Sequence, residues 1–275
     1  MAMTVRTNVA SMKASGQLGK TTRALTKGLE RISSGLRINR AADDAAGLGV
    51  ATNLETATIS QQQGIRNAYD GISIIQTAES ATNEITDILQ RMRELAIQSA
   101  SDTLDNDERA YIEDEFTQLQ DEVRRISANT EFNGVQLADG TTTQLDVQVG
   151  IQNDTVSRIS IQIGDLTASN LGIHTGISLA TATQARAALD LIDVALDTVN
   201  SVRSELGAVQ NRLESAINNA MVFTEALSAA ESQIRDADFA EETAELTKNQ
   251  ILQQAGVAAL AQAKNMNQAV ISLLQ

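Results

Sequence analysis

The sequence contains side chains of types that perform chemistry, but their spacing does not group a nucleophile, a base and an orienting residue. His174 is the only histidine and there is no cysteine, which excludes cysteine-ligated metal sites. Asp43 and Asp44 are adjacent, and adjacent positions on a helix point about 100° apart, which favours helix N-capping over a shared cation. Gly47 and Gly49 lack the preceding strand and the third glycine of a phosphate-binding loop. We therefore expect no enzymatic activity, no metal and no cofactor.

The composition points to long helices. The 275 residues include no proline, no cysteine and no tryptophan, and aromatic residues make up 2%. An interior proline costs a helix about 3 kcal/mol or more, so its absence permits long uninterrupted helices. The net charge of −14 argues against nucleic acid as a partner, because a nucleic-acid-binding surface must neutralise phosphates.

The charge is unevenly distributed along the chain. Residues 1–42 contain eight lysines and arginines against a single acidic residue, Glu30. A basic, Ser/Thr-rich N-terminus of this kind leaves an organelle transit peptide open as one interpretation. The sequence has no apolar core of a cleaved secretory signal and no apolar run long enough to span a membrane. If the protein is exported, we expect a route that needs no such signal.

The strongest pattern is an apolar stripe that recurs every three or four residues from Ala185 to Ile234. It predicts one helix about 75 Å long, at about 1.5 Å per residue, packed along its length against other helices. Weaker stripes predict helices over 4–38, 43–100 and 236–275, and a further helix through Ile112 and Ile126. The members of the main stripe are Ala185, Ala188, Ile192, Ala195, Val199, Val202, Leu206, Val209, Leu213, Ala216, Ala220, Phe223, Leu227, Ala230 and Ile234.

Between these helices the hydrophobic period changes to two. Asn133-Gly134 is a turn signal, and apolar residues then alternate with polar ones through 145–149 and again through 159–163. This alternation predicts two half-buried strands joined through 150–154, in a small β region over 133–178. The expected fold class is therefore mainly α: a long antiparallel helical bundle, or rod, with a small β-hairpin region and two terminal helical arms.

Three segments follow from this order: an N-terminal arm (1–42), a central rod domain (43–235) and a C-terminal arm (236–275). Each arm has about ten modest apolar side chains, which contribute at most about 15–30 kcal/mol when buried. Ordering about 40 backbones costs roughly 40–80 kcal/mol. We therefore predict that the arms are disordered in the monomer and become helical on assembly, whereas the rod folds by itself.

Four stretches of the sequence resemble bacterial flagellins. Residues 29–51 (LERISSGLRINRAADDAAGLGVA) are similar to the N-terminal region of that family, and residues 69–98 (YDGISIIQTAESATNEITDILQRMRELAIQ) to its first long shaft helix. Residues 129–137 (NTEFNGVQL) are similar to its turn into the β region, and 234–274 to its C-terminal stretch. Because 139–179 leaves no room for extra outer domains, the resemblance is to a minimal flagellin without the outer variable domains.

The resemblance implies a structural subunit that polymerises into the flagellar filament for swimming motility. It implies a coiled-coil-like inner tube made of the two arms, and a secreted, extracellular location reached through the flagellar type III export apparatus. The implied partners are further copies of the chain, an export chaperone at the C-terminal arm, and filament cap and hook-junction proteins, with no nucleic acid and no membrane insertion. The residues expected to pack in the inner tube are Val5, Val9, Met12, Leu25, Leu29, Ile32, Leu36, Leu252, Met266, Val270 and Leu273.

A second set of residues follows from the same resemblance. In many flagellins the stretch that matches Gln90–Gln98 contacts neighbouring subunits and also binds the flagellin-recognising Toll-like receptor of animal hosts. Arg91, Leu95 and Gln98 fit that pattern, and Glu115 fits the companion position on the next helix. We expect inter-subunit packing as their first role, with Leu95 in the core, and innate-receptor contact as a second.

Two other interpretations stay open at this point. Another flagellar axial protein, either a hook–filament junction protein or a periplasmic-flagellum core flagellin, would share much of this pattern. A signalling coiled coil, such as the cytoplasmic domain of a chemoreceptor, would share the long stripes but not the β region or the 29–51 stretch.

Overall fold

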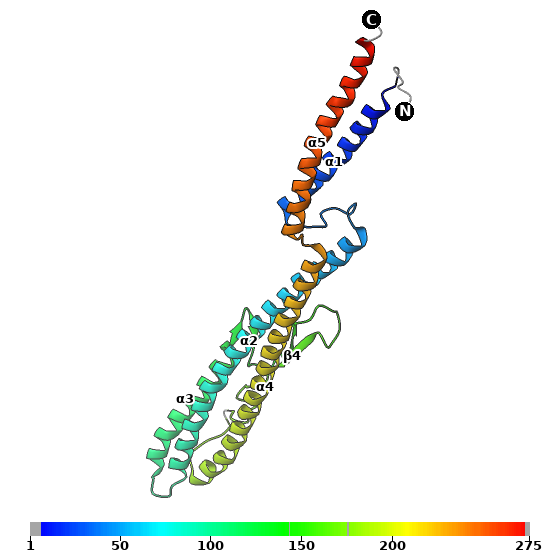
Figure 1. Ribbon diagram of the computed structural model, residues 1–275. Coiled ribbons are helices and arrows are strands. Elements are labelled where there is room, and N and C mark those ends of the chain that lie inside the picture. The colour runs from blue at the N-terminus through cyan, green and yellow to red at the C-terminus, as the bar shows by residue number, and fades with distance from the viewer. Residues whose placement is uncertain (1–6, 143, 175, 273–275) are drawn as a thin grey trace. The chain divides into compact units, whose positions relative to one another are not determined.

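The computed structural model describes residues 7–142, 144–174 and 176–272, with side chains as far as Asn265 (Figure 1). These residues fold as two compact units, one made of the chain up to Thr56 together with the chain from Ala226, and the other of 57–225. The expected arm boundaries at 42/43 and 235/236 fall between helices, whereas the two units divide within two long helices. The helices are α1 (Val9–Ser34), α2 (Ala45–Ser99), α3 (Asn106–Asn129), α4 (Ala182–Arg235) and α5 (Phe239–Ser272).

In the unit that contains the chain ends, α1 and α5 lie side by side and run antiparallel (Figure 1). The side chain of Asn8 caps α1 by accepting a hydrogen bond from the Ser11 N–H at 2.9 Å. Gly35 ends the helix in the left-handed conformation (φ 73°), where a residue without Cβ is favoured. The helices expected over 4–38 and 236–275 are thus confirmed over Val9–Ser34 and Phe239–Ser272, whereas 35–38 and 236–238 are not helical.

Two connectors, 35–44 and 236–238, join these helices to α2 and α4. They pair through an isolated antiparallel bridge between Leu36 and Asp236. The backbone N–H of Arg37 donates to the Arg235 carbonyl at 2.7 Å, and the N–H of Ala237 donates to the Gly35 carbonyl at 2.9 Å. The bridge therefore ties the start of α5 to the end of α1.

The unit 57–225 contains most of α2, all of α3 and most of α4. α3 begins with a capping box, in which Asp105 and Glu108 each accept a hydrogen bond from the other's backbone N–H. The guanidinium of Arg109, 8% exposed, donates to the carbonyls of Ser99 and Ser101 at 3.1 and 2.7 Å. These bonds satisfy carbonyls at the C-terminal end of α2, where a positive charge is favourable.

Four short strands form two antiparallel hairpins in this unit: β1 (Glu131–Phe132) with β2 (Val135–Gln136), and β3 (Gln144–Gln148) with β4 (Arg158–Gln162). The Asn133-Gly134 turn has positive φ at both residues, 50° and 79°, as a two-residue hairpin loop requires. Both hairpins confirm the β region expected from the change of period. The second hairpin lies close against α2, because a Cβ on Gly64 would come within 2.4 Å of the Val149 carbonyl oxygen.

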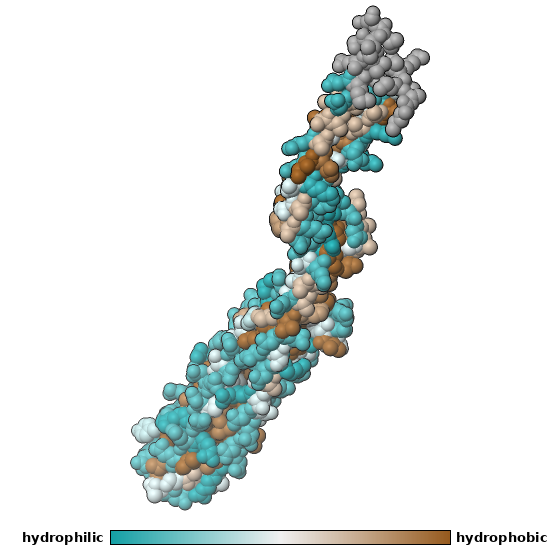
Figure 2. All heavy atoms as spheres, in the orientation of Figure 1, coloured by the Kyte–Doolittle hydropathy of each residue, from teal (hydrophilic) through white to brown (hydrophobic). Residues whose placement is uncertain are grey.

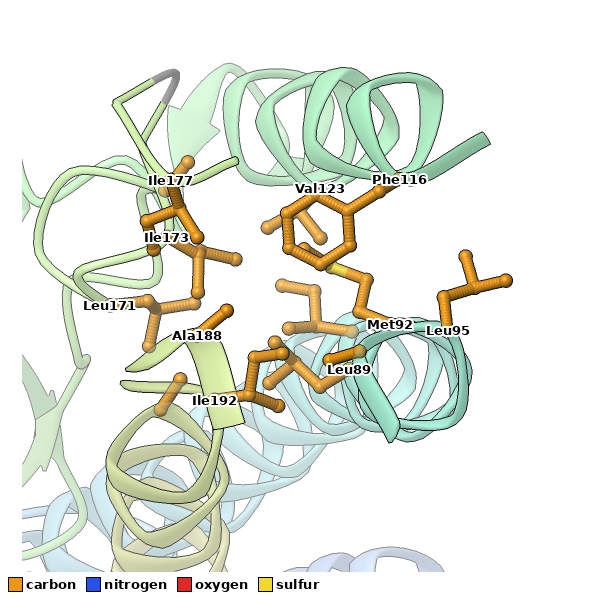
Figure 3. Close-up of a cluster of buried hydrophobic side chains, with 14 of the residues drawn as sticks. Leu89, Met92, Leu95, Phe116, Val123, Leu171, Ile173, Ile177, Ala188 and Ile192 are labelled. Atoms are coloured by element: carbon orange, nitrogen blue, oxygen red, sulfur yellow. The ribbon is translucent and has the colours of Figure 1, made fainter. Parts of the chain in front are cut away.

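The unit has two clusters of buried apolar side chains. The first gathers side chains from α2, α3, α4 and the segment 163–181, with the Phe116 ring beside Met92 (Figure 3). The second joins α2 and α4 to β4, through residues such as Ile75, Ile161 and Leu213. An N–H from the 163–181 segment, that of Leu179, donates to the Glu113 carboxylate and holds this segment on α3.

The apolar stripe of α4 is buried over most of its length. It stays buried or half-buried from Ala185 to Ala220. Phe223 then departs from the prediction of an unbroken buried stripe, because its side chain is 44% exposed. Leu227, Ala230 and Ile234 are half-buried in the other unit. Within the described residues, none of the helices is both long enough and apolar enough to cross a membrane.

Candidate assembly surfaces

The residues singled out for chemistry have structural roles. Asp44 caps α2, because its carboxylate accepts the Gly47 N–H at 2.9 Å, which confirms the N-capping interpretation. Asp43 forms an ion pair with Lys27 at 2.5 Å, and this hydrogen-bonded ammonium lowers the pKa of the Asp43 carboxyl. His174 lies exposed in a loop, where its Nδ1 accepts the Gly176 N–H at 3.0 Å. Among the residues that the structure describes, no group of three or more His, Cys, Asp or Glu could hold a metal ion.

The residues expected in the inner tube divide into two groups. Leu25, Ile32 and Leu36 are half-buried within the unit that contains the chain ends. Four others are largely exposed in the single chain: Val9 (53%), Met12 (67%), Leu29 (50%) and Leu252 (45%). Val5 and Leu273 lie outside the described residues, and Met266 and Val270 lie beyond the described side chains.

The contact between α1 and α5 includes the predicted Leu25 and Ile32, but most of its residues were missed by the sequence reasoning. The buried and half-buried positions recur every three or four residues on both helices, and we call these positions the arm seam. Many of them are small or polar, so a search for apolar stripes does not detect them. The signal that could have revealed them is the same three-four spacing, traced through Gly, Ala, Ser, Thr and Asn. The arm seam consists of Ser11, Ala14, Leu18, Thr21, Leu25, Gly28 and Ile32 on α1, and Glu242, Leu246, Asn249, Gln253, Gly256, Leu260 and Ala263 on α5.

Outside the arm seam, α1 and α5 expose large apolar side chains. Besides the four named above, Phe239, Ile251 and Val257 are 54–60% exposed on α5. Apolar surface is visible among hydrophilic residues along this helix pair (Figure 2). Scattered single apolar residues are normal on a protein surface, but seven large ones exposed on two neighbouring helices make these helices candidates for contact with other chains.

The second predicted set lies on α2 and α3. Arg91 donates from Nε and Nη2 to one carboxylate oxygen of Glu115, at 2.9 and 2.8 Å, and from Nη1 to Glu94 at 2.9 Å. These hydrogen bonds raise the pKa of the Arg91 guanidinium, with Glu115 as the larger cause. Gln98 is exposed, whereas Leu95 is 2% exposed and lies in the core. The structure therefore brings Arg91 and Glu115 together on the surface and places Leu95 beneath it.

Comparison with known proteins gives the family. The bacterial flagellin N-terminal helical region matches residues 5–143, and the bacterial flagellin C-terminal helical region matches residues 189–274. The flagellin of Halalkalibacterium halodurans is 44% identical over 276 residues, which cover 99% of this chain and all of that protein. The flagellar filament 33 kDa core protein of Treponema phagedenis is 40% identical over 288 residues, and the flagellin of Bacillus subtilis is 40% identical over 305, each with the same coverage.

A solved structure agrees with these relatives. The crystal structure of Bacillus cereus flagellin is 30% identical and superposes with a TM-score of 0.50 over 56% of this chain and 88% of that chain. The relatives are flagellins and flagellar filament core proteins, so they do not favour a hook–filament junction protein. The alignment with the Halalkalibacterium halodurans flagellin spans 276 residues and all of that protein, which agrees with a short flagellin that lacks the outer variable domains. The chain belongs to the bacterial flagellin family, and it is a structural subunit that polymerises into the flagellar filament for swimming motility.

Proposed function

We propose that this subunit polymerises through the exposed apolar side chains of its arms, which meet neighbouring copies in an inner tube. The observation that carries the proposal is the exposure of Val9, Met12, Leu29, Ile251 and Leu252 in the single chain. Burying a fully exposed aliphatic side chain contributes about 1.5–3 kcal/mol, so each of these roughly half-exposed side chains contributes about 1 kcal/mol. Several such contributions per neighbour favour a polymer.

The described parts of the two arms, 7–42 and 236–272, are proposed to be disordered in the free monomer and ordered by assembly, while the rod of 43–235 folds independently. The composition of the arm seam supports this proposal. Small and polar residues such as Ala14, Gly28, Thr21 and Asn249 bury little apolar area between α1 and α5. That burial is too small to offset the backbone entropy of two long segments without contacts to other copies.

The proposed location is the extracellular filament, reached by type III flagellar export. The proposed partners are other copies, the filament cap, the hook-junction proteins and an export chaperone that covers the C-terminal arm. The exposure of Ile251, Leu252 and Val257 on α5 supports the chaperone, because binding of a chaperone would shield these apolar side chains from water before assembly. Family membership supports the rest of the proposal.

The exposed face of α2 and α3 is proposed as an inter-subunit contact, and in the free monomer as a surface for the host Toll-like receptor. Arg91, Gln98 and Glu115 would make such contacts directly. Leu95 would act from the core, by holding α2 in place beneath Arg91. The paired Arg91 and Glu115 present a fixed polar surface rather than two mobile charges.

Leu252→Asp tests the assembly surface. We expect the variant monomer to fold but not to extend filament seeds, because burying an unpaired carboxylate costs several kcal/mol. The matched control is Gln254→Asp, at an exposed polar position on the same helix, and this variant should extend seeds normally. Pelleting and electron microscopy measure assembly, and hydrogen exchange on the unassembled chain measures arm order. Normal filament yield from Leu252→Asp would refute the surface, and slow exchange throughout both arms of the monomer would refute the folding on assembly.

A further inference from the structure

The arm seam holds α1 and α5 in one antiparallel register. Near the connectors, Arg31 Nη1 lies 2.7 Å from Glu242 Oε1. Farther along, the Cβ of Leu18 lies 3.9 Å from the position that a Cβ would take on Gly256. Arg31 is thirteen residues from Leu18, and Glu242 is fourteen residues from Gly256, so both contacts belong to the same register.

Apolar packing alone does not select this register. Leu18 and Leu25 are seven residues apart on α1, and both are half-buried. A slip of α1 by seven residues would bring Leu25 over Gly256 in place of Leu18. The opposite slip would bring Ser11 there. Because each slipped arrangement again sets a side chain of modest size against glycine, the repeat of seven leaves alternatives with similar packing.

Arg31, which is next to the arm-seam residue Ile32, and Glu242 of the arm seam do distinguish the registers. The side chains of Arg31 and Glu242 are only 26% and 13% exposed, and the buried Arg31 Nε has no hydrogen-bond partner among the described residues. Asn249 is 9% exposed, but it donates to Glu245 of the same helix at 3.4 Å, so this bond is kept in every register. The slip that brings Ser11 to Gly256 would carry Glu242 away from Arg31, to the level of Leu25. It would leave a poorly solvated carboxylate without its cation.

We propose that Arg31 and Glu242 are the residues that determine the register of the two arms. A buried polar group destabilises the helix pair in every register, but least in the register where its partner is present. It therefore selects one register and lowers the stability of the helix pair. This inference rests on the proposed folding of the arms during assembly, since segments that order late must find one register among several.

Engineered disulfides test the register, and the chain has no cysteine of its own to interfere. The pair Leu18→Cys with Gly256→Cys reports the native register, because a Cβ separation of 3.9 Å suits a disulfide. The pairs Leu25→Cys with Gly256→Cys and Ser11→Cys with Gly256→Cys report slips of seven residues in either direction. Intramolecular disulfides are separated from intermolecular ones on non-reducing gels after oxidation of assembled filaments.

Each pair is placed in the natural background and in the background Arg31→Leu/Glu242→Leu. In the natural background only the native pair should close. In the apolar background the slipped pairs should close at least tenfold more often. The matched control background is Glu30→Leu/Arg40→Leu, which removes a more exposed ion pair of the same length and should leave the slipped pairs open.

Tagged variant chains are co-assembled with excess natural chains, so a variant that assembles poorly alone is still measured. Glu242→Gln is the second variant, which keeps the side-chain shape and should raise the slipped disulfides less. If the apolar background and Glu242→Gln close only the native pair, the backbone bridge at Leu36 and Asp236 determines the register and the inference is wrong. Failure of the natural chain to assemble would instead overturn the proposed function, and pelleting detects it before any oxidation.

Discussion

Gly64→Ala should destabilise the unit 57–225, although alanine is the better helix former. In the middle of α2, replacing glycine by alanine ordinarily stabilises a helix by about 1 kcal/mol. Here the new Cβ would lie 2.4 Å from the Val149 carbonyl oxygen and 3.0 Å from its carbon. These are backbone atoms, so the hairpin of β3 and β4 has to move away from α2. Overpacking of this kind costs typically about 1–3 kcal/mol.

The movement also weakens a hydrogen bond across the same contact. Gln61 Nε2 donates to the Val149 carbonyl at 3.3 Å, and such a bond contributes about 1 kcal/mol. Together these effects give a net destabilisation of about 1–3 kcal/mol. The matched control is Gly207→Ala on α4, which has nothing within 4 Å of the new Cβ and should be stabilised by about 0.5–1 kcal/mol.

Urea unfolding of the monomer, followed by far-UV circular dichroism, measures both variants against the natural chain. The test is the sign of each variant's change in the free energy of unfolding relative to the natural chain. The two substitutions are chemically identical and both lie in helices of the same unit, so opposite signs must come from their surroundings. Equal stabilisation by Gly64→Ala and Gly207→Ala would refute the close approach of the hairpin to α2.

Two further predictions concern the core and the ion pairs of the same unit. Phe116→Ala should lower the free energy of unfolding by about 3–5 kcal/mol, because the ring is fully buried. The control Tyr111→Ala removes a side chain that is 75% exposed on the same helix, and it should change this free energy by less than about 0.5 kcal/mol. Similar losses from both variants would contradict the core shown in Figure 3. Arg93 Nε lies 2.7 Å from Asp193 Oδ1, and this hydrogen-bonded guanidinium lowers the pKa of the Asp193 carboxyl below its ordinary 3.8. A carboxyl with a lowered pKa in the folded state contributes stability above its ordinary pKa and loses it as the pH falls through the lowered value. The urea midpoint of the natural chain should therefore fall below about pH 4, and it should fall less steeply for Asp193→Asn; identical acid profiles would exclude a contribution from this pair.

The helices and hairpins were predictable because their signals are local. Asn133-Gly134 favours a two-residue turn by its backbone preferences alone, and the alternation around Val147 and Ile161 marks strands with one buried face. The N-cap at Asp44 also follows from residue type and position. Each of these depends on residues within a few positions of each other.

The errors and omissions lie where distant segments meet. Phe223 continues the spacing of the α4 stripe, yet its neighbours leave it 44% exposed. Val9 and Met12 are expected to pack in the inner tube, but their spacing does not show that within the single chain α5 covers the face of α1 that carries Ser11 and Ala14. Spacing along one helix shows that a face can be buried, but not which face its partner will cover.

The sequence by itself determined the helix lengths, the hairpin positions and the family, because proline-free apolar periodicity, turn residues and long motifs are properties of the chain read in order. Only the tertiary structure decided which residues form the arm seam, that Arg31 forms an ion pair with Glu242, and that Arg91 forms one with Glu115; the burial of Leu95 was already expected from the sequence. The physical reason is that burial and ion pairing depend on where separate segments lie against each other: Arg31 and Glu242 are 211 residues apart in sequence, and Arg91 and Glu115 are 24 apart. That arrangement is selected by the free energy of the whole packed unit rather than by the local conformational propensity of either segment.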